Sequence, residues 1–501
     1  MVFSSLEFIY LFLLPVLAIF LLLRMIRHEG AIIWWLILAS LGFYAWWSPL
    51  HLLLLLGSVV GNFGLHRLLL QHRSKALLSF GIMANLALLA WFKYADFLLE
   101  NISALVGNGE VQTLGIILPL AISFFTFQQV SFLLDTWNDK FERCDFKRYV
   151  LFVTFFPQLI AGPIVLQNDT IPQFHLSNFT SRTGLNILVG TTLFAIGLFK
   201  KVVLADGLAP IANGVFGAAD AGQLLTMEAA WQGALAYTFQ IYFDFSGYCD
   251  MALGIARMFG IRLPINFNSP YKSLSISEFW RRWHITLSRF LRDYLYIALG
   301  GNRSGWLGRH GNLMATMLLG GLWHGAGWNF VIWGGLHGGY LVINHFWRDL
   351  VGHYNLKRLA PQPIRLIMAW SLTMLAVVFA WVFFRAETFN GALIMLSAMF
   401  VPAVQSIANV PANVVIDPTF TVLSIAALII VVTALPNSIE ITRNYRPVID
   451  TVKELANSDT GTRLVWRPAG AWSLVIAAAG AGALIQLYRL NDMTEFIYFN
   501  F

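Results

Sequence analysis

The sequence predicts an all-α polytopic membrane protein, and its composition and the spacing of its apolar runs lead to this fold class. The chain has 501 residues, of which 57% are hydrophobic and 12% are charged. Soluble domains carry roughly twice that charged fraction. Apolar runs of roughly 20 residues, the length that crosses a bilayer as a helix, recur from one end of the chain to the other.

These runs predict roughly 11 to 14 membrane segments, some of them re-entrant. We do not expect the first run to be a cleavable signal peptide, because Arg24 and Arg27 follow it and do not precede it. Loops 66–75 and 140–148 are basic and expected in the cytoplasm, whereas the loop near 96–110 is acidic and expected outside. The segments are expected at about residues 6–24, 31–49, 50–66, 76–95, 114–134, 148–166, 184–204, 228–256, 312–330, 331–347, 364–384, 389–404, 418–436 and 470–488.

Two prolines interrupt the segment expected at 148–166. Pro157 and Pro163 both lie within an otherwise apolar run. Proline breaks or kinks a helix, and broken backbone at membrane depth lines a cavity or is buried in protein. A kink without functional consequence is the alternative.

Residues 257–309 differ from the rest of the chain in charge. They contain nine basic and two acidic side chains, a net charge of +7, which is also the net charge of the whole chain. This excess predicts a cytoplasmic location. The segment either sets topology and contacts anionic lipids or forms a mouth that attracts a polyanionic substrate.

Within that segment, residues 277–294 have helical periodicity. Aromatic and aliphatic side chains recur on one side, which predicts an amphipathic helix lying in the membrane interface. His284 on the polar side, beside arginines, is also a candidate to face a charged ligand. The polar side consists of Ser277, Arg281, His284, Ser288 and Arg292.

His324 stands in the longest stretch without charge near the middle of the chain. No Asp, Glu, Lys or Arg lies between Arg309 and Arg348. A titratable group is costly inside a bilayer, so an intramembrane histidine is a functional candidate. Eight glycines, His337 and Asn329 lie between residues 320 and 339. The alternative is close helix packing through small residues, with histidines hydrogen-bonded to neighbouring helices.

Other residues give weaker signals. Asp244 and Asp250 lie in an apolar helix, where we expect each to pair with an arginine or to join a proton path. Cys144 and Cys249 form no framework, and no zinc-like spacing of Cys and His occurs. The sequence also lacks phosphate-loop, dinucleotide, metalloprotease and nucleophile-elbow motifs. We therefore expect no metal, no bound cofactor and no nucleic-acid partner.

Five motifs follow one another along the chain: Phe156–Pro163, Tyr242–Tyr248, Asn266–Tyr271, Phe279–His284 with Arg292–Tyr294, and Leu322–Gly325. In this order they resemble the membrane-bound O-acyltransferase superfamily, specifically its bacterial alginate O-acetyltransferase branch. The similarity runs from about residue 90 to 385, and the tail 496–501 resembles that branch more weakly. The resemblance implies a single integral membrane domain over 1–501, with its catalytic core at about 90–385. It also implies a ring of tilted helices around a central funnel with re-entrant segments.

The resemblance also implies a function and assigns residues to it. In the family the residue matching His324 is catalytic and the one matching His284 is a second active-site residue. The branch moves acetyl from cytoplasmic acetyl-coenzyme A, as substrate, to acceptors outside the inner membrane, with a periplasmic partner protein. We expect His324 to act as general base, or through a transient acetyl-histidine or acetyl-serine. His284 would orient the substrate or stabilise an oxyanion.

Further contacts are expected around these two histidines. Arg281 and Arg282 would hold phosphates, and the remaining substrate-binding candidates are Trp323, Asn329, Asp244 and Ser288. Membrane lipids are expected as partners of this multi-pass inner-membrane chain. Alginate is the favoured acceptor, with cellulose, peptidoglycan or teichoic acid D-alanylation as alternatives. A proton-coupled transporter using Asp244, Asp250, His324 and His337, or a structural scaffold, is the alternative from another class.

Overall fold

Helices are the only regular secondary structure in the part of the chain that the structure describes, which confirms the predicted all-α class. This computed structural model describes residues 2–107, 113–140, 144–303, 305–354, 361–401, 418–449, 464–468, 470–489 and 496–497. In these ranges the only β-pairing is an isolated bridge between Pro264 and Ile449. The chain divides into two compact units, and the predictions of one domain, a helical ring and a central funnel stay predictions.

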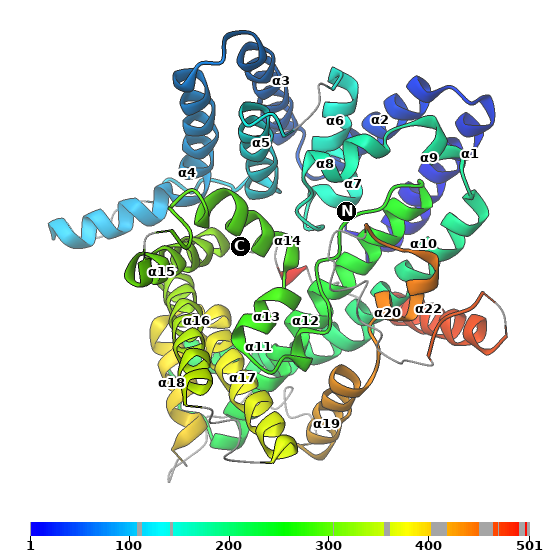
Figure 1. Ribbon diagram of the computed structural model, residues 1–501. Coiled ribbons are helices and arrows are strands. Elements are labelled where there is room, and N and C mark those ends of the chain that lie inside the picture. The colour runs from blue at the N-terminus through cyan, green and yellow to red at the C-terminus, as the bar shows by residue number, and fades with distance from the viewer. Residues whose placement is uncertain are drawn as a thin grey trace. The chain divides into compact units, whose positions relative to one another are not determined.

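The first unit comprises Met1–Phe199, Gly247–Ile265 and Ser438–Asn500. Helix α5 packs on both α3 and α4, and Figure 1 shows these three as neighbours. Helix α10 packs on α22. The helices of this unit are η1 (Glu7–Leu13), α1 (Leu14–Ile26), α2 (Glu29–Trp47), α3 (Pro49–His72), α4 (Lys75–Val106), α5 (Ile122–Trp137), α6 (Phe146–Thr154), α7 (Phe156–Leu159), α8 (Gln167–Thr170), η2 (Ile171–Gln173), α9 (Leu176–Thr180), α10 (Thr183–Phe199), α20 (Ser438–Thr442), η8 (Arg443–Tyr445) and α22 (Ala471–Arg489).

The predicted break near the two prolines is present. Helix α6 ends at Thr154, and Pro157 lies in the first turn of the short α7, where its missing N–H leaves no bond unmade. Phe155 and Phe156 at the break are fully buried. Gln158 Nε2 donates to the Phe152 carbonyl at 2.6 Å, so a side chain satisfies backbone that the break exposes. The break is therefore buried in protein, as one of the two predicted alternatives requires.

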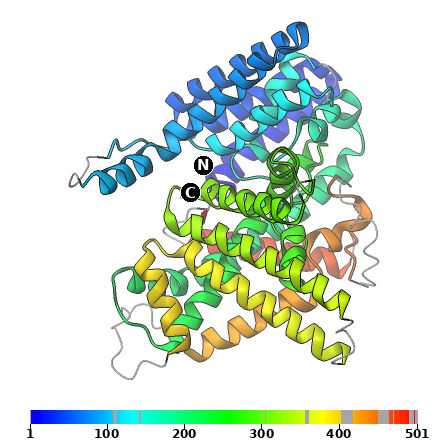
Figure 2. The same ribbon diagram turned by 60° about the vertical axis from the view of Figure 1, so that its left-hand side comes forward.

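The second unit comprises Lys200–Ser246 and Asn266–Asn437. Helices α15 and α16 form a hairpin, α17 packs on α16, and the three lie side by side in both views (Figures 1 and 2). Its elements are η3 (Lys200–Ala205), α11 (Asp206–Asp220), the part of α12 (Met227–Met258) up to Ser246, η4 (Pro270–Lys272), α13 (Ile276–Arg282), α14 (Ile285–Phe290), η5 (Leu291–Tyr296), α15 (Gly305–His324), α16 (Trp328–His353), α17 (Gln362–Arg385), α18 (Phe389–Phe400) and α19 (Pro418–Ala434).

Fewer helices than expected have the length and hydropathy of a membrane span. Among the described residues there are seven, or up to eight if residues 421–445 count as one broken span. The segments expected at 114–134, 228–256, 312–330 and 331–347 contain helices, but these are too short or too polar to qualify. The prediction of an acidic loop near 96–110 is wrong for residues 96–106, because α4 continues to Val106. The seven are Glu7–Ile26, Glu29–Trp47, Pro49–His72, Lys75–Val106, Thr183–Asp220, Gln362–Arg385 and Ala471–Arg489.

Candidate active site

The predicted amphipathic helix at 277–294 is broken at His284. Ser275 caps α13 by accepting from the Glu278 N–H at 3.2 Å, and α13 ends at Arg282. His284 has φ 44° and ψ 52°, a left-handed conformation that a continuous helix excludes. The prediction of one helix with His284 on its polar side is therefore wrong. The break turns His284 inward, where it is fully buried, while Arg281 stays exposed.

Asn266 holds the inward-turned imidazole. His284 Nδ1 lies 3.1 Å from Asn266 Oδ1, which also accepts from the Thr286 N–H at 3.3 Å and from Thr286 Oγ1 at 2.9 Å. The Thr286 N–H can only donate, so this Asn266 atom is the carbonyl oxygen and His284 Nδ1 carries the proton. The lone pair of a neutral His284 then resides on Nε2.

Burial keeps His284 neutral. Removal from water lowers the pKa of His284 to about 3, because the imidazolium form loses its hydration. Phe245 lies with its ring centroid 4.9 Å from that of His284, and Phe267 at 6.5 Å. At neutral pH the side chain therefore presents an acceptor nitrogen and not a positive charge.

His324 is the last residue of α15, at the turn into α16. Gly321 on α15 and Gly334 on α16 let the two backbones touch: a Cβ on Gly321 would lie 2.2 Å from the Phe330 carbonyl oxygen, and one on Gly334 would lie 2.4 Å from the Met317 carbonyl oxygen. At Gly325 the Phe330 ring fills the space. These glycines serve close helix packing, which is the alternative that the sequence left open for this region.

The two histidines come together from segments 40 positions apart in the sequence. Their ring centroids are 6.3 Å apart, with an interplanar angle of 61°. His324 is 3% exposed and His284 is 0% exposed. Trp323 contacts both rings, with centroids 4.8 Å from His324 and 6.1 Å from His284. We call His284 and His324 the histidine pair.

Aromatic rings enclose the pair on the His324 side. The centroid of Trp333 lies 5.0 Å from that of His324, and that of Phe384 lies 5.2 Å away. Such a shell excludes water, and hydrogen bonds and charges interact more strongly in the low dielectric that results. The environment suits a reaction from which water must be excluded.

His337 has a different role. It is fully buried on α16, and Trp280 Nε1 donates to its Nδ1 at 3.2 Å. Its ring stacks on Phe279 with centroids 6.1 Å apart. These contacts join α13 to α16, which is the structural role that the sequence left as an alternative.

Two predicted substrate contacts serve the fold. Asn329 Nδ2 donates to the Ala386 carbonyl at 2.8 Å, which joins the start of α16 to the end of α17. Ser288 Oγ donates to the Trp280 carbonyl at 3.1 Å, across the break at His284.

The two arginines expected to hold phosphates differ from each other. Arg282 forms an ion pair with Glu278 at 2.9 Å and donates to the Asn268 carbonyl at 3.1 Å. Arg281 is exposed and makes no ion pair with the part of the chain that the structure describes. Arg281 thus remains available for a ligand, whereas Arg282 is occupied within the fold.

Asp244 pairs with a lysine, not with the expected arginine. Lys201 Nζ lies 2.9 Å from Asp244 Oδ1 and 2.6 Å from Asp206 Oδ1; Lys201 and Asp244 are buried, and Asp206 is largely shielded. A single buried cation between two carboxylates explains why Asp244 can stand in an apolar helix. Asp250 accepts from Ser438 Oγ at 2.8 Å in the first unit. The arrangement gives Asp244 a structural role.

Sequence reasoning missed Asn266 and Lys201. Asn266 belongs to one of the resembling motifs, but nothing local assigns an asparagine to a particular histidine. Lys201 was detectable, because a lysine next to an apolar run is a natural partner for an intramembrane aspartate. No group of three or more His, Cys, Asp or Glu side chains could hold a metal ion within the described ranges.

Comparison with known families settles the class of protein. Residues 68–382, more than half of the chain, match MBOAT, the membrane-bound O-acyltransferase family. The chain belongs to the membrane-bound O-acyltransferase family. The matched region contains His284, His324 and Asn266, together with Trp323 and Trp333. The predicted resemblance is confirmed.

Individual relatives cover most of this membrane-bound O-acyltransferase. It is 46% identical over 396 residues to a peptidoglycan O-acetyltransferase of Helicobacter pylori, covering 73% of each chain. It is 42% identical over 409 residues to a probable alginate O-acetylase of Azotobacter vinelandii, covering 80% of this chain and 78% of the relative. It is 38% identical over 512 residues to one of Pseudomonas putida, covering 100% of both. The protein is therefore a multi-pass membrane acyltransferase, and the transporter and scaffold alternatives are not favoured.

Proposed function

We propose that this acyltransferase moves acetyl groups from cytoplasmic acetyl-coenzyme A to hydroxyl groups of a polysaccharide outside a bacterial inner membrane, using the histidine pair. The observation that carries the proposal is the approach of two buried imidazoles, with centroids 6.3 Å apart inside an aromatic shell. At this spacing a nitrogen from each ring can reach groups of one bound substrate.

In the proposed reaction His324 is the general base. It takes the proton from the acceptor hydroxyl while that oxygen attacks the thioester carbonyl carbon. The C–S bond then breaks, and the proton passes from His324 to the departing thiolate of coenzyme A. This transfer returns His324 to its neutral form. A positioned base of this kind contributes roughly 10²–10⁴-fold in rate.

His284 is proposed to orient the substrate. Asn266 fixes the proton on Nδ1, so that Nε2 accepts a hydrogen bond from an N–H or O–H group of the substrate. The amide N–H groups of the pantetheine arm and the acceptor hydroxyl are both of this kind. With the proton on Nδ1, His284 has no N–H at Nε2 to donate. The tautomer therefore does not favour the alternative in which His284 stabilises an oxyanion.

The net charge of +7 in residues 257–309 supports a polyanionic donor such as acetyl-coenzyme A. Some of this charge is paired within the fold, as in Arg282–Glu278 and Arg292–Asp293. Arg281, exposed and without such a pair in the described chain, is the proposed phosphate contact of this segment. We propose a periplasmic protein as the partner that receives acetyl or passes it on to the polymer.

Alginate is the proposed acceptor, on the likeness to probable alginate O-acetylases, one of which aligns with this chain from end to end. Peptidoglycan is the second candidate, favoured by the 46% identity to the Helicobacter pylori enzyme. Both acceptors present sugar hydroxyl groups, so the chemistry proposed for the histidine pair is the same.

The test is acetyl transfer by the purified protein in liposomes. We expect labelled acetyl from acetyl-coenzyme A to appear as alkali-labile ester on mannuronate oligomers, or on peptidoglycan fragments if the second candidate is right. The assay includes periplasmic extract from the source cell as the supply of partner protein. Failure to transfer acetyl to either acceptor, with or without extract, would contradict the proposal.

A further inference from the structure

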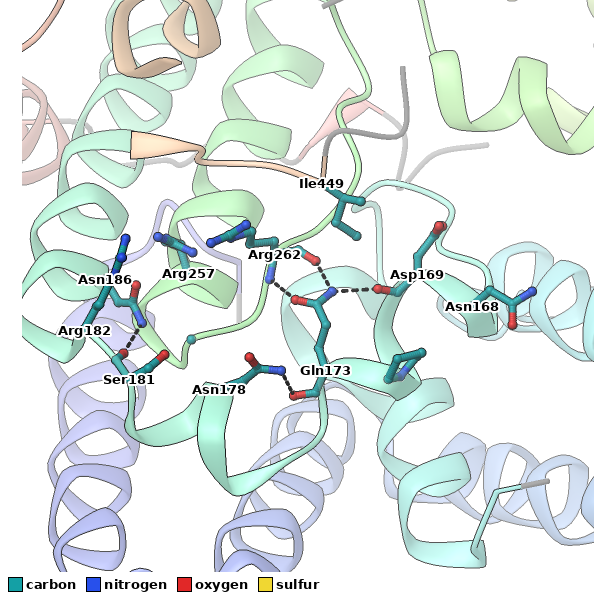
Figure 3. Close-up of a pocket in the computed structure, with 12 residues that line it drawn as sticks. Asn168, Asp169, Gln173, Asn178, Ser181, Arg182, Asn186, Arg257, Arg262 and Ile449 are labelled. Atoms are coloured by element: carbon teal, nitrogen blue, oxygen red, sulfur yellow. Dashed lines mark hydrogen bonds between the residues drawn. The ribbon is translucent and has the colours of Figure 1, made fainter. Parts of the chain in front are cut away.

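The first unit contains a cavity of about 410 Å³ that is separate in sequence from the histidine pair. Its walls come from α8 and the segment after it, the start of α10, the end of α12 with the turn that follows, and Ile449 (Figure 3). Every residue that lines it belongs to the first unit, whereas His284 and His324 belong to the second. The acyl-transfer chemistry proposed above does not use it.

Three arginines line this cavity: Arg182, Arg257 and Arg262. Figure 3 shows their side chains gathered on one side, with the nitrogen-bearing ends close together. They come from the turn before α10, the last turn of α12 and the segment just after it. We call them the arginine cluster.

Among the residues that the structure describes, no carboxylate pairs with the cluster. None of the three forms an ion pair or a side-chain hydrogen bond with any residue that the structure describes, and Arg257 is only 4% exposed. Arg257 Nε is buried with no hydrogen-bond partner in the described chain. Asp169, the one acidic residue in the lining, accepts from the Leu166 N–H at 3.1 Å as part of the cap of α8.

Burying a charged group without a partner is costly, and bringing like charges together adds to the cost. Burial and then the charges of Arg262 and Arg182 lower the pKa of Arg257 to about 10. The guanidinium nevertheless remains protonated at neutral pH. An anion in the cavity would relieve both penalties.

The backbone around the cavity is fixed by hydrogen bonds. Gln173 Nε2 donates to the Arg262 carbonyl at 2.8 Å, and Gln173 Oε1 accepts from the Arg262 N–H at 2.9 Å. Asn178 Nδ2 donates to the Gln173 carbonyl at 3.0 Å. Figure 3 shows these bonds tying the segments together. The backbone segments that carry the arginine cluster are therefore held in place by these hydrogen bonds.

Gly260 allows the turn after α12 to pack closely against the segment around Asn178. Its φ is +82°, and a Cβ there would lie 2.3 Å from the Asn178 carbonyl oxygen. Only glycine combines that backbone conformation with so close an approach. The turn brings Arg257 and Arg262, on either side of it, to the same cavity.

We propose that the arginine cluster binds a phosphate-bearing anion. A phosphate or pyrophosphate group offers several acceptor oxygens that match guanidinium donors, and amide donors such as Asn186 line the same wall. The group can belong to a nucleotide, such as the phosphate end of a coenzyme, or to an anionic lipid headgroup. The inference does not depend on acetyl transfer, because it concerns binding alone.

The experiment measures saturable binding of labelled pyrophosphate to the purified full-length protein in zwitterionic detergent. We expect Arg257→Gln and Arg182→Gln each to weaken binding at least about tenfold, the loss typical of one charged hydrogen-bonding partner. Arg67→Gln changes the net charge equally at an exposed site on α3 outside the cavity, and should bind as the wild type does.

Competition identifies the source of the phosphate. Displacement by adenosine 3′,5′-bisphosphate supports a nucleotide, and displacement by short-chain phosphatidylglycerol supports a lipid headgroup. Arg182 is exposed, so its variant tests the site even if the Arg257 variant fails to fold. Absence of saturable pyrophosphate binding to the wild type, or unchanged binding in folded Arg182→Gln protein, would overturn the proposal.

Discussion

Asn266 decides what His284 can do. Its side-chain oxygen accepts from His284 and twice from Thr286, so one buried amide fixes the tautomer of the imidazole and the start of α14 together. A histidine that is both neutral and δ-protonated is a hydrogen-bond acceptor toward the substrate. Asn266 is therefore a positioning residue whose effect on the reaction passes through His284.

We expect Asn266→Ala to lower kcat roughly 10- to 100-fold, because loss of a partner in a buried hydrogen bond costs about 1–3 kcal/mol. If Asn266 acts through His284, the double variant Asn266→Ala/His284→Ala should be little worse than His284→Ala alone. Steady-state kinetics of the three variants check this. Full additivity of the two losses would show that Asn266 acts independently.

The depressed pKa of His284 predicts an acid sensitivity of the fold. The unfolded chain takes up a proton near pH 6.5, whereas the folded protein does so only near pH 3. The folded state therefore loses stability as pH falls below 6.5, by about 2 kcal/mol at pH 5 from this group. His284→Asn should remove that part of the decrease.

The measurement compares unfolding of the detergent-solubilised protein at pH 7 and pH 5. His353→Asn, at an exposed position near the end of α16, is the matched control and should keep the wild-type dependence on pH. An identical loss of stability in wild type and His284→Asn would show that His284 is not held neutral by the fold.

At the scale of elements, the α15–α16 hairpin places His324. Close backbone contact at Gly321 and Gly334 brings the Trp333 ring against His324, at 5.0 Å between centroids. We expect Gly321→Ala to destabilise the protein by about 1–3 kcal/mol, because its Cβ would meet the Phe330 carbonyl at 2.2 Å. Acetyl transfer should fall with it.

Gly339→Ala is the matched control for the hairpin. It lies on α16, the other helix of the hairpin, and a Cβ there meets nothing within 4 Å. Alanine favours a helix over glycine, so this variant should be neutral or slightly stabilising. Equal melting temperatures for the two variants would contradict the role given to the close contact.

Lys201 links two elements of the second unit. It lies between Asp206 on α11 and Asp244 on α12, and both Lys201 and Asp244 are buried. We expect Lys201→Met to destabilise the protein by about 3–5 kcal/mol, because removing one partner of a buried ion pair leaves charge uncompensated. Lys75→Met, at an exposed position, should have little effect on thermal unfolding. Similar melting temperatures for both variants would show that the buried lysine is dispensable.

Elements were predicted well where hydrophobic periodicity alone sets them. The segments expected at 31–49, 364–384 and 470–488 match α2, α17 and α22 within a few residues. The break at His284 could not be predicted in this way, because the periodicity of residues 277–294 is helical throughout. The break arises from tertiary contacts with Asn266, whose main-chain carbonyl also accepts a hydrogen bond from the Ile285 N–H at 2.9 Å.

At the scale of the whole molecule, composition and the order of motifs predicted the class and the family. The histidine pair, Asn266 and the aromatic shell all belong to the second unit, and the arginine cluster belongs to the first. Sequence reasoning named both histidines but assigned phosphate contacts only to Arg281 and Arg282. It missed the arginine cluster because its members are separated by 75 and 5 positions and meet only through the turn at Gly260.

The most direct test of the central claim is the rate of acetyl-dependent coenzyme A release by His324→Ala protein. The account predicts a fall of at least about 100-fold, since a general base contributes roughly 10²–10⁴-fold. The melting temperature should stay near that of wild type, and the exposed control His353→Ala should keep full activity. A folded His324→Ala protein that releases coenzyme A and acetylates its acceptor within about threefold of the wild-type rate would contradict the account.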